Sequence, residues 1–345
     1  MSDITLDVFN GDAFSTLSLT DAINKVPFVP GRAGQVAGWE EEPVATTQIM
    51  IEEIGGELKL VDPTPRGGPG QPGAGEKRNA RSLVIPHYQV DDFIMADSVQ
   101  NVRAFGQTST LEVLQERVNT RLRNLVSWRL DPTLEHQRVG AIKGIILNAD
   151  GSTLYNLFTE FGVTQEAEVD FDLDNATPTD GVLRKKCAGI VRKIAGNLGG
   201  VATGPIFAEC GDAFFDDLLA HPEVRESYKN TDMASVLREG YVTPNGTIYG
   251  VFEFGGIVWE NYRGGVGGTP FIGTDACHIF PIGVPGLWRT IFAPADYEET
   301  VNTPGLPRYA KQYPSANGKG RHLEVQMNAL NYCTRPKVLM KGKRT

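Results

Sequence analysis

Glycine and proline fill more than half of positions 63–75, and a strand-like segment lies on each side of this stretch. TTQIMIEEIGGELKLVD (46–62) precedes it and SLVIPHYQV (82–90) follows it, both containing many residues that favour strands. Because glycine and proline interrupt strands and favour turns, the pattern predicts a long hairpin with a mobile tip. An isolated hairpin is marginally stable in water, so we expect this one to lie on a neighbour. A disordered linker between two domains is the alternative interpretation.

The clearest helix is predicted at STLEVLQERVNTRLRNLVSWRL (109–130), where apolar residues recur every three or four positions. Ser109 and Glu112 have the spacing of a capping box. Asp131 and Pro132 suit the start of a second helical piece, and the pattern leaves open whether the two pieces form one kinked helix. The arginines of the first piece mostly face away from its apolar stripe: Arg117, Arg121 and Arg123.

The other segments mix helices with strands, which predicts an α+β fold. We expect helices at 183–198 and 211–228, the second broken at His221 and Pro222. The basic face of the helix at 183–198 is interpreted as solvent-exposed, with nucleic acid or an acidic partner as the alternative. Strands are expected within 143–158, 246–264 and 321–336, a loop at GGVGGTP (264–270), and an extended arm at residues 1–38.

Residues that could carry chemistry are sparse. None of the five histidines pairs with another at the spacing of a helical zinc site, and there is no nucleophile-elbow or phosphate-loop motif. The four cysteines lie far apart and are interpreted as free thiols in a reducing compartment: Cys187, Cys210, Cys277 and Cys333. We therefore expect neither a metal site nor a cofactor.

The segment FAPADYEETVNTPG (292–305) gathers three carboxylates, Asp296, Glu298 and Glu299, beside a tyrosine. Such a group could hold a cation or act in acid–base catalysis, which would make the chain a metal-dependent hydrolase. No histidine, lysine or second acidic cluster supports that chemistry. The other interpretation is a set of salt bridges, for which nearby Arg289 and Arg308 are the candidate partners.

The charge balance of −9, from 33 basic and 42 acidic residues, disfavours a broad nucleic-acid-binding face. The N-terminus is acidic and does not have the pattern of a signal peptide. No apolar stretch approaches the roughly 20 residues of a membrane-spanning helix. We expect a soluble protein that is made inside the cell and binds no membrane.

Five segments, in order along the chain, closely resemble the lambda-type major capsid proteins of tailed bacteriophages, the capsid protein E family. They are EHQRVGAIKGIILNADGSTLYNLF (135–158), LLAHPEVRE (218–226), FEFGGIVWENYRGG (252–265), CHIFPIGVPGLWRTIFAPADYEETVNTPGLPRYAKQ (277–312) and EVQMNALNYCTRPKVLMK (324–341). The resemblance implies the Hong Kong 97-like capsid fold. That fold combines an N-terminal arm, an extended loop hairpin, a spine helix, a peripheral domain and an axial domain.

Mapped onto this chain, the resemblance implies five regions. They are the arm at 1–38, the extended loop hairpin at 39–95, the spine helix and peripheral domain at 96–199, the axial domain at 200–300, and a return to the peripheral domain at 301–345. Residues 109–130 would be the spine helix. The hairpin would overlap an adjacent subunit.

The function implied by the resemblance is that of a major capsid protein without enzymatic activity. Such a chain self-assembles into hexamers and pentamers of an icosahedral shell that encloses double-stranded DNA without sequence-specific binding. The implied partners are a scaffold protein, a portal and, in some phages, a decoration protein. The shell would be assembled in the host bacterial cytoplasm and become part of the virion.

Residues at the hairpin and in the acidic segment are the candidates for contacts between subunits: Arg66, Lys77, Arg78, Arg81, Asp296, Glu298 and Glu299. Some capsids of this fold join subunits through a Lys–Asn isopeptide bond assisted by a glutamate. Lys77 is the one tempting lysine, but no accompanying Asn and Glu can be identified, so we expect no crosslink. An encapsulin-like container and the hydrolase based on Asp296, Glu298 and Glu299 remain the alternative functions.

Overall fold

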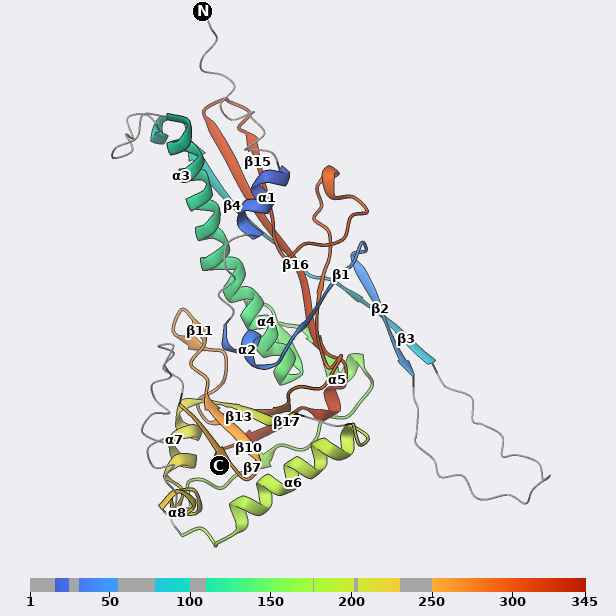
Figure 1. The fold of residues 1–345 in the computed structure, drawn as a ribbon, viewed down its shortest axis with the longest axis vertical. Helices are drawn as coiled ribbons and strands as arrows, with labels where there is room; N and C mark the ends of the chain where they lie inside the picture. The colour runs from blue at the N-terminus through green and yellow to red at the C-terminus, as the bar shows by residue number, and fades with distance from the viewer. Residues whose placement is uncertain are drawn as a thin grey trace, which may run out of the picture.

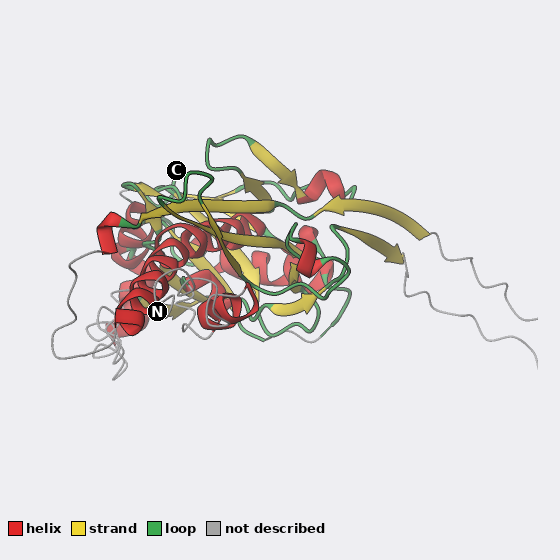
Figure 2. Ribbon diagram, turned by 90° about the horizontal axis from the view of Figure 1, so that it is seen from above, coloured by secondary structure: helices red, strands yellow, loops and turns green. Residues whose placement is uncertain are grey.

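The computed structural model describes residues 16–24, 31–54, 78–99, 110–175, 177–201, 204–229 and 250–345. Within these ranges two β-sheets form the body, and the longer helices lie over them (Figure 1). Seen from above, the strands gather on one side of the body and most helices on the other (Figure 2). The predicted α+β class is confirmed.

A continuous helical rod crosses the upper part of the molecule. It consists of α3 (Thr110–Leu125), a π-helical turn (Val126–Leu130) and α4 (Asp131–Lys143). Proline has no N–H to donate and its ring crowds the preceding turn. The wider π turn accommodates Pro132, and the Asp131 N–H bonds Val126 O, five residues back. The two helical pieces expected from the sequence are therefore one rod.

The rod covers a five-stranded sheet. Its strands are β1 (Glu40–Pro43), β14 (Trp288–Phe292), β16 (Gly320–Cys333), β15 (Tyr309–Pro314) and β4 (His87–Met95). The long strand β16 pairs with β4 and β15 along its first half and with β14 along its second half. Leu122, Val126 and Leu130 of the rod pack in one buried cluster with Val325 and Met327 of β16. Val118 and Leu122 of the predicted apolar stripe are buried in this cluster, so the stripe faces the sheet.

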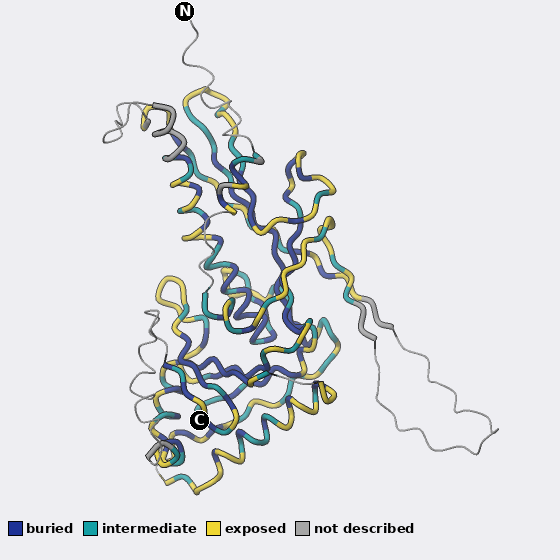
Figure 3. The backbone as a smooth tube through the Cα atoms, in the orientation of Figure 1, coloured by how far each residue is buried: buried dark blue, intermediate teal, exposed yellow. Residues whose placement is uncertain are grey.

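A six-stranded sheet forms the lower part of the body. Its order is β7 (Val169–Asp170), β17 (Met340–Lys343), β13 (Ala276–Pro281), β8 (Ile206–Cys210), β10 (Ile257–Asn261) and β9 (Val251–Phe254). Helices α6 (Val182–Asn197), α7 (Asp212–Ala220) and α8 (Pro222–Lys229) accompany it. Phe171, Phe214 and Trp259 contact one another in its core. In Figure 3 the strands of this sheet are mostly buried, and α6, which lies below them in the view, has exposed outer turns.

Several smaller elements agree with the sequence. The hairpin predicted within 143–158 is β5 (Ile145–Leu147) with β6 (Thr153–Asn156), followed by α5 (Leu157–Glu160). Helix α6 buries Leu183, Cys187, Ile190 and Ile194, and α7 and α8 meet at His221 and Pro222 as expected. Short 3-10 turns occur at Asp97–Val99, Glu298–Thr300 and Pro336–Val338.

Two local expectations are wrong. The described part of residues 1–38 is not extended, because α1 (Thr16–Asn24) and α2 (Arg32–Val36) are helical. Leu19 and Ile23 of α1 are 1% and 2% exposed, so this helix belongs to the core. The expected loop at 264–270 is a small hairpin of β11 (Gly265–Val266) and β12 (Thr269–Pro270).

The hairpin predicted around the glycine- and proline-rich stretch is confirmed at its base. Strands β2 (Gln48–Ile54) and β3 (Arg78–Val84) pair from Gln48–Val84 to Ile54–Arg78. Both strands extend away from the body (Figures 1 and 2). Its tip at 55–77 lies outside the described residues.

Helix α2 links the helical rod to the six-stranded sheet. Arg32 bonds to Glu260 of β10, while the backbone N–H groups of Ala33 and Gly34 donate to Glu135 of α4. Tyr262 Oη also donates to Glu135, at 2.8 Å. The segment therefore ties the helical rod to the six-stranded sheet.

Candidate functional site

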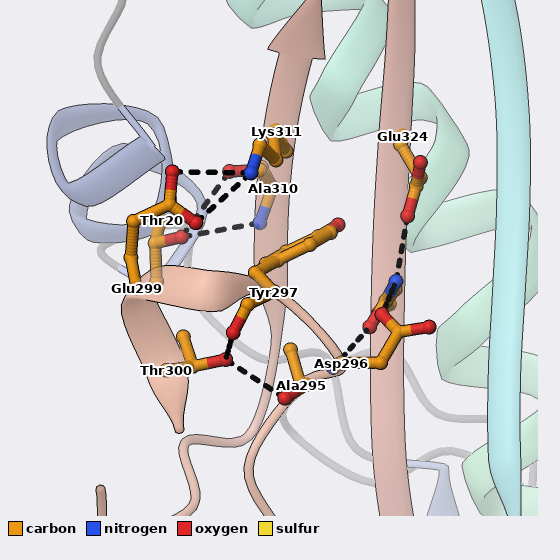
Figure 4. Close-up of polar contacts among 10 residues, drawn as sticks. Thr20, Ala295, Asp296, Tyr297, Glu299, Thr300, Ala310, Lys311 and Glu324 are labelled. Carbon is orange, nitrogen blue, oxygen red and sulfur yellow. Dashed lines mark hydrogen bonds and ion pairs between the residues drawn. The ribbon is translucent and has the colours of Figure 1, made fainter.

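The acidic segment lies between β14 and β15, beside α1 (Figure 4). Two of its own side chains, Thr300 and Tyr297, fix its conformation. Thr300 Oγ1 donates to Ala295 O at 2.7 Å and lies 3.0 Å from Tyr297 O. Tyr297 is 6% exposed and packs edge-on against Tyr309 of β15. A buried aromatic and a bonded threonine therefore hold the acidic side chains in place.

Asp296 contacts a neutral amide. Gln326 Nε2, on β16, donates to Asp296 Oδ1 at 2.5 Å and to Glu324 Oε1 at 2.6 Å. Gln326 is fully buried, so these bonds satisfy a side chain that would otherwise lose its partners on folding. Asp296 thus anchors the segment to the central strand of the five-stranded sheet.

Glu299 forms an ion pair with Lys311 of β15, with Lys311 Nζ 2.9 Å from Oε2. Lys311 Nζ also lies 4.8 Å from the centre of the Tyr297 ring, a cation–π geometry. Hydrogen bonding from Lys311 lowers the pKa of Glu299. Burial raises the pKa of Tyr297, and the Glu324 carboxylate raises it further, so this phenol stays neutral.

Glu298 is exposed and makes no ion pair with any residue that the structure describes. The expectation that Arg289 and Arg308 pair with this segment is wrong. Arg289 pairs with Glu42 at 3.0 Å and Arg308 with Asp131 at 2.7 Å. Salt bridging is therefore present in the segment, but its cation is Lys311.

The three carboxylates do not converge on a common point. Asp296 is directed at β16, whereas Glu299 is directed at β15 (Figure 4). Within the described ranges, no group of three or more His, Cys, Asp or Glu side chains is arranged to hold a metal ion. The arrangement positions a surface loop and does not assemble an acid–base pair.

The cysteines lack the properties of nucleophiles. All four are buried free thiols, as the sequence predicted. Burial raises the pKa of both Cys187 and Cys333 to about 12. The reactive form is the thiolate, so these side chains remain in the unreactive thiol form near neutral pH. In the part of the chain that is described, no helix is both long and apolar enough to cross a membrane.

The basic residues of the hairpin fall into two groups. Arg66 and Lys77 lie outside the described residues, and Arg78 begins β3. Arg81 Nη1 donates to Thr159 O of α5 at 2.7 Å. Tyr155 Oη donates to Val84 O, also at 2.7 Å. The base of β3 is therefore fixed to its own subunit, which the sequence did not reveal.

A groove of about 730 Å³ lies where the hairpin leaves the five-stranded sheet. Its lining includes Glu42, Val44, Gln48, Met50 and Tyr332. Met50 is 72% exposed and Val84 is 52% exposed. Exposed apolar side chains at the base of this hairpin are suited to contact with another molecule.

A family model described as phage major capsid protein E matches residues 15–344. The major capsid protein of Pseudomonas phage KPP10 is 30% identical over 344 residues, which cover 96% of this chain and 97% of that protein. The major capsid protein of Salmonella phage Felix O1 is 23% identical, with 95% of each chain covered. A solved structure described as a capsid protein of an Escherichia coli CFT073 prophage has a TM-score of 0.52 at 11% identity, covering 78% of this chain and 80% of that one.

Proposed function

Because this chain belongs to the phage major capsid protein E family, we propose that it builds hexamers and pentamers of an icosahedral shell around double-stranded DNA. The chain is a major capsid protein of a tailed phage, and its role is structural and not enzymatic. The main support for this conclusion is the family match, which extends over residues 15–344. The fold agrees with it, since the solved prophage capsid protein has the same overall architecture.

The further partners belong to the proposal. A scaffold protein, a portal and, in some phages, a decoration protein would assist or complete the shell in the host cytoplasm. The packaged DNA would be held without sequence-specific contacts. The net charge of −9 supports this, because a negatively charged wall does not bind strongly to a phosphate backbone.

The domains of this fold can be assigned to the two sheets. The rod and the five-stranded sheet would form the peripheral domain. The six-stranded sheet with α6, α7 and α8 would form the axial domain. That domain was expected at 200–300, and the assignment also places β7, α6 and β17 in it, because they pair with or cover the same sheet.

Two surfaces are proposed to contact neighbouring subunits. One is the β2–β3 hairpin, with Arg66, Lys77, Arg78 and Arg81 on it; the other is the loop that carries Asp296, Glu298 and Glu299. Two features support this assignment: the direction of the hairpin, away from its own body, and the exposure of Glu298. The hydrolase and the encapsulin-like container are not favoured, since the family is that of phage capsid proteins.

Negative-stain electron microscopy of the expressed protein tests the proposal. Shells, capsomer rings or curved sheets are expected. A monodisperse monomer that hydrolyses an ester or phosphodiester, and loses that activity in Glu298→Gln, would overturn it. Denaturing electrophoresis of mature particles should show single chains, since we expect no isopeptide crosslink through Lys77.

A further inference from the structure

Trp128 is 73% exposed although it lies within the long helical rod. The chain has three other tryptophans. Trp259 and Trp288 are at most 1% exposed, and Trp39 is partly buried against Trp288. Exposing a whole indole to water forgoes the free energy that its burial would contribute. Packing within the subunit therefore does not explain why a tryptophan occupies this position.

The position of Trp128 is set by the backbone. It lies in the π-helical turn, between Val126 and Leu130, which are 0% and 1% exposed. These two residues face the sheet, so the turn directs Trp128 away from it. Because the rod is continuous on both sides of the turn, the indole is held outward by a rigid element. A side chain on a rigid backbone needs no ordering of its backbone when it binds a partner.

The surroundings of Trp128 are basic. Residues 117–130 contain four arginines and no acidic residue, in a chain whose net charge is −9. Arg117 and Arg121 already bond to Ser98 O and Asp92. Arg123 and Arg129 are exposed and form no ion pair with any residue described. Arg129 directly follows Trp128 in the π turn, and we call these two residues the Trp128 patch.

We propose that the Trp128 patch docks onto an acidic surface of a second copy of this chain. The inference rests on the proposed function, since a shell protein must bury surface against its own copies. Tryptophan and arginine are the residue types that most often dominate the binding energy of protein interfaces. The excess of acidic residues in the chain supplies the complementary charge.

Packaged DNA is a poorer match for this patch. The bases of a duplex are paired and stacked, so an indole that projects from a helix has no free base face to stack on. Phosphate contacts alone would need arginines but would not need the tryptophan. A protein surface uses both the flat apolar ring and the guanidinium group of Arg129.

Acrylamide quenching of tryptophan fluorescence tests the proposal, because Trp128 is the one tryptophan with high exposure. Unassembled wild-type subunits are compared with empty shells that contain no DNA and no other protein. Trp128→Phe provides the background from the other three tryptophans. We expect the quenching due to Trp128 to fall several-fold on assembly. Equal quenching in subunits and empty shells would overturn the proposal, as would protection that appears only after DNA packaging or only with a second protein bound.

Variants give an independent readout. Trp128→Ala and Arg129→Glu should leave the urea midpoint of the unassembled subunit unchanged and reduce shell yield by about tenfold or more, the scale of losing an interface hot spot. Arg192→Glu, on the exposed face of α6, is the matched control and should assemble normally. Normal shell yield from both variants would contradict the proposal while leaving the capsid function intact. Failure of the wild-type chain to form shells would instead count against the capsid function.

Discussion

Arg32 binds Glu260 through two parallel hydrogen bonds, from Nε to Oε1 at 2.6 Å and from Nη2 to Oε2 at 2.7 Å. The Glu260 side chain is fully buried on β10, whereas Arg32 retains some exposure on α2. A bidentate pair of this kind fixes orientation as well as charge. It joins the N-terminal segment to the six-stranded sheet, so the fold of the body depends on residues that precede its first strand.

Removing Arg32 should therefore destabilise the subunit strongly. Arg32→Met leaves the Glu260 carboxylate buried without its cation, and we expect a loss of about 3–5 kcal/mol in the free energy of unfolding. Urea denaturation of the unassembled subunit measures this. The double variant Arg32→Met with Glu260→Leu removes both charges and should recover most of the loss. A double variant as unstable as the single one would show that the ion pair is not the cause.

Glu209 should make the subunit lose stability as the pH rises. It is fully buried on β8, and neither carboxylate oxygen has a hydrogen-bond partner in the described structure. Burial raises the pKa of Glu209 well above its usual value, and the carboxylates of Glu135 and Glu260 raise it further. The folded state therefore binds this proton more tightly than the unfolded state does. The stability that Glu209 contributes is fully present below the pKa that this side chain has in the unfolded chain. It is lost as the pH rises through the pKa that the side chain has in the folded chain.

Glu209→Gln tests this pH dependence, because glutamine resembles the protonated acid and cannot ionise. Urea midpoints of the variant should decline less than those of the wild type as pH is raised from about 5 to 9. Glu298→Gln, at an exposed position, is the control and should follow the wild type. Parallel curves for the wild type and Glu209→Gln would contradict the assignment.

The elements that could be predicted are those whose signal lies in their own residues. The predicted stripe that includes Val118 and Leu122 indicates a helix with a buried face whatever the sheet beneath it. Helix α1 could not be predicted in this way, because it is short and buries Leu19 and Ile23 only through contact with distant residues such as Ala310. The small hairpin at 264–270 did carry a signal. Gly267 and Gly268 both have positive φ, as a two-residue hairpin turn requires.

The candidate site illustrates the same limit. Sequence proximity suggested Arg289 and Arg308 as partners of the acidic segment. Instead, strand pairing brings Lys311 beside Glu299, and β16 brings Gln326 beside Asp296. These partners depend on which strands lie side by side. The π turn at Val126–Leu130 likewise follows from Pro132. Which of its side chains are buried, however, depends on the sheet that the rod packs against.

Deleting residues 64–78 should separate folding from assembly. The base of the hairpin is tied to the body by Arg81 and Tyr155, so the subunit should unfold at nearly the wild-type urea midpoint. Shell formation or shell stability should fall, because the proposed overlap with a neighbouring subunit is lost. Electron microscopy and the thermal stability of the particles measure this. Robust shells of normal appearance would refute the role assigned to the hairpin.

Glu298→Gln should also affect assembly more than folding. The side chain is exposed and unpaired within the described subunit, so its loss should change the free energy of unfolding by less than about 0.5 kcal/mol. Glu299→Gln is the comparison, since it breaks the pair with Lys311 and should cost up to about 1 kcal/mol. If Glu298 contacts a neighbour, shell yield should fall in salt-free buffer. Identical assembly of the variant and wild type would remove Glu298 from the interface.

Gly305→Ala should disrupt the acidic segment at its C-terminal end. Gly305 N donates to Val44 O at 2.9 Å, next to the end of β1. A Cβ at this position would lie 2.1 Å from Phe292 O, which is a backbone atom of β14 and cannot move aside as a side chain could. We expect a loss of about 2 kcal/mol or more, because either the sheet or the loop must shift. Gly189→Ala is the control, since Gly189 lies in α6 with open space around it and should gain roughly 0.5–1 kcal/mol. Equal urea midpoints for the two variants would mean that the close approach at Phe292 does not hold the loop in place.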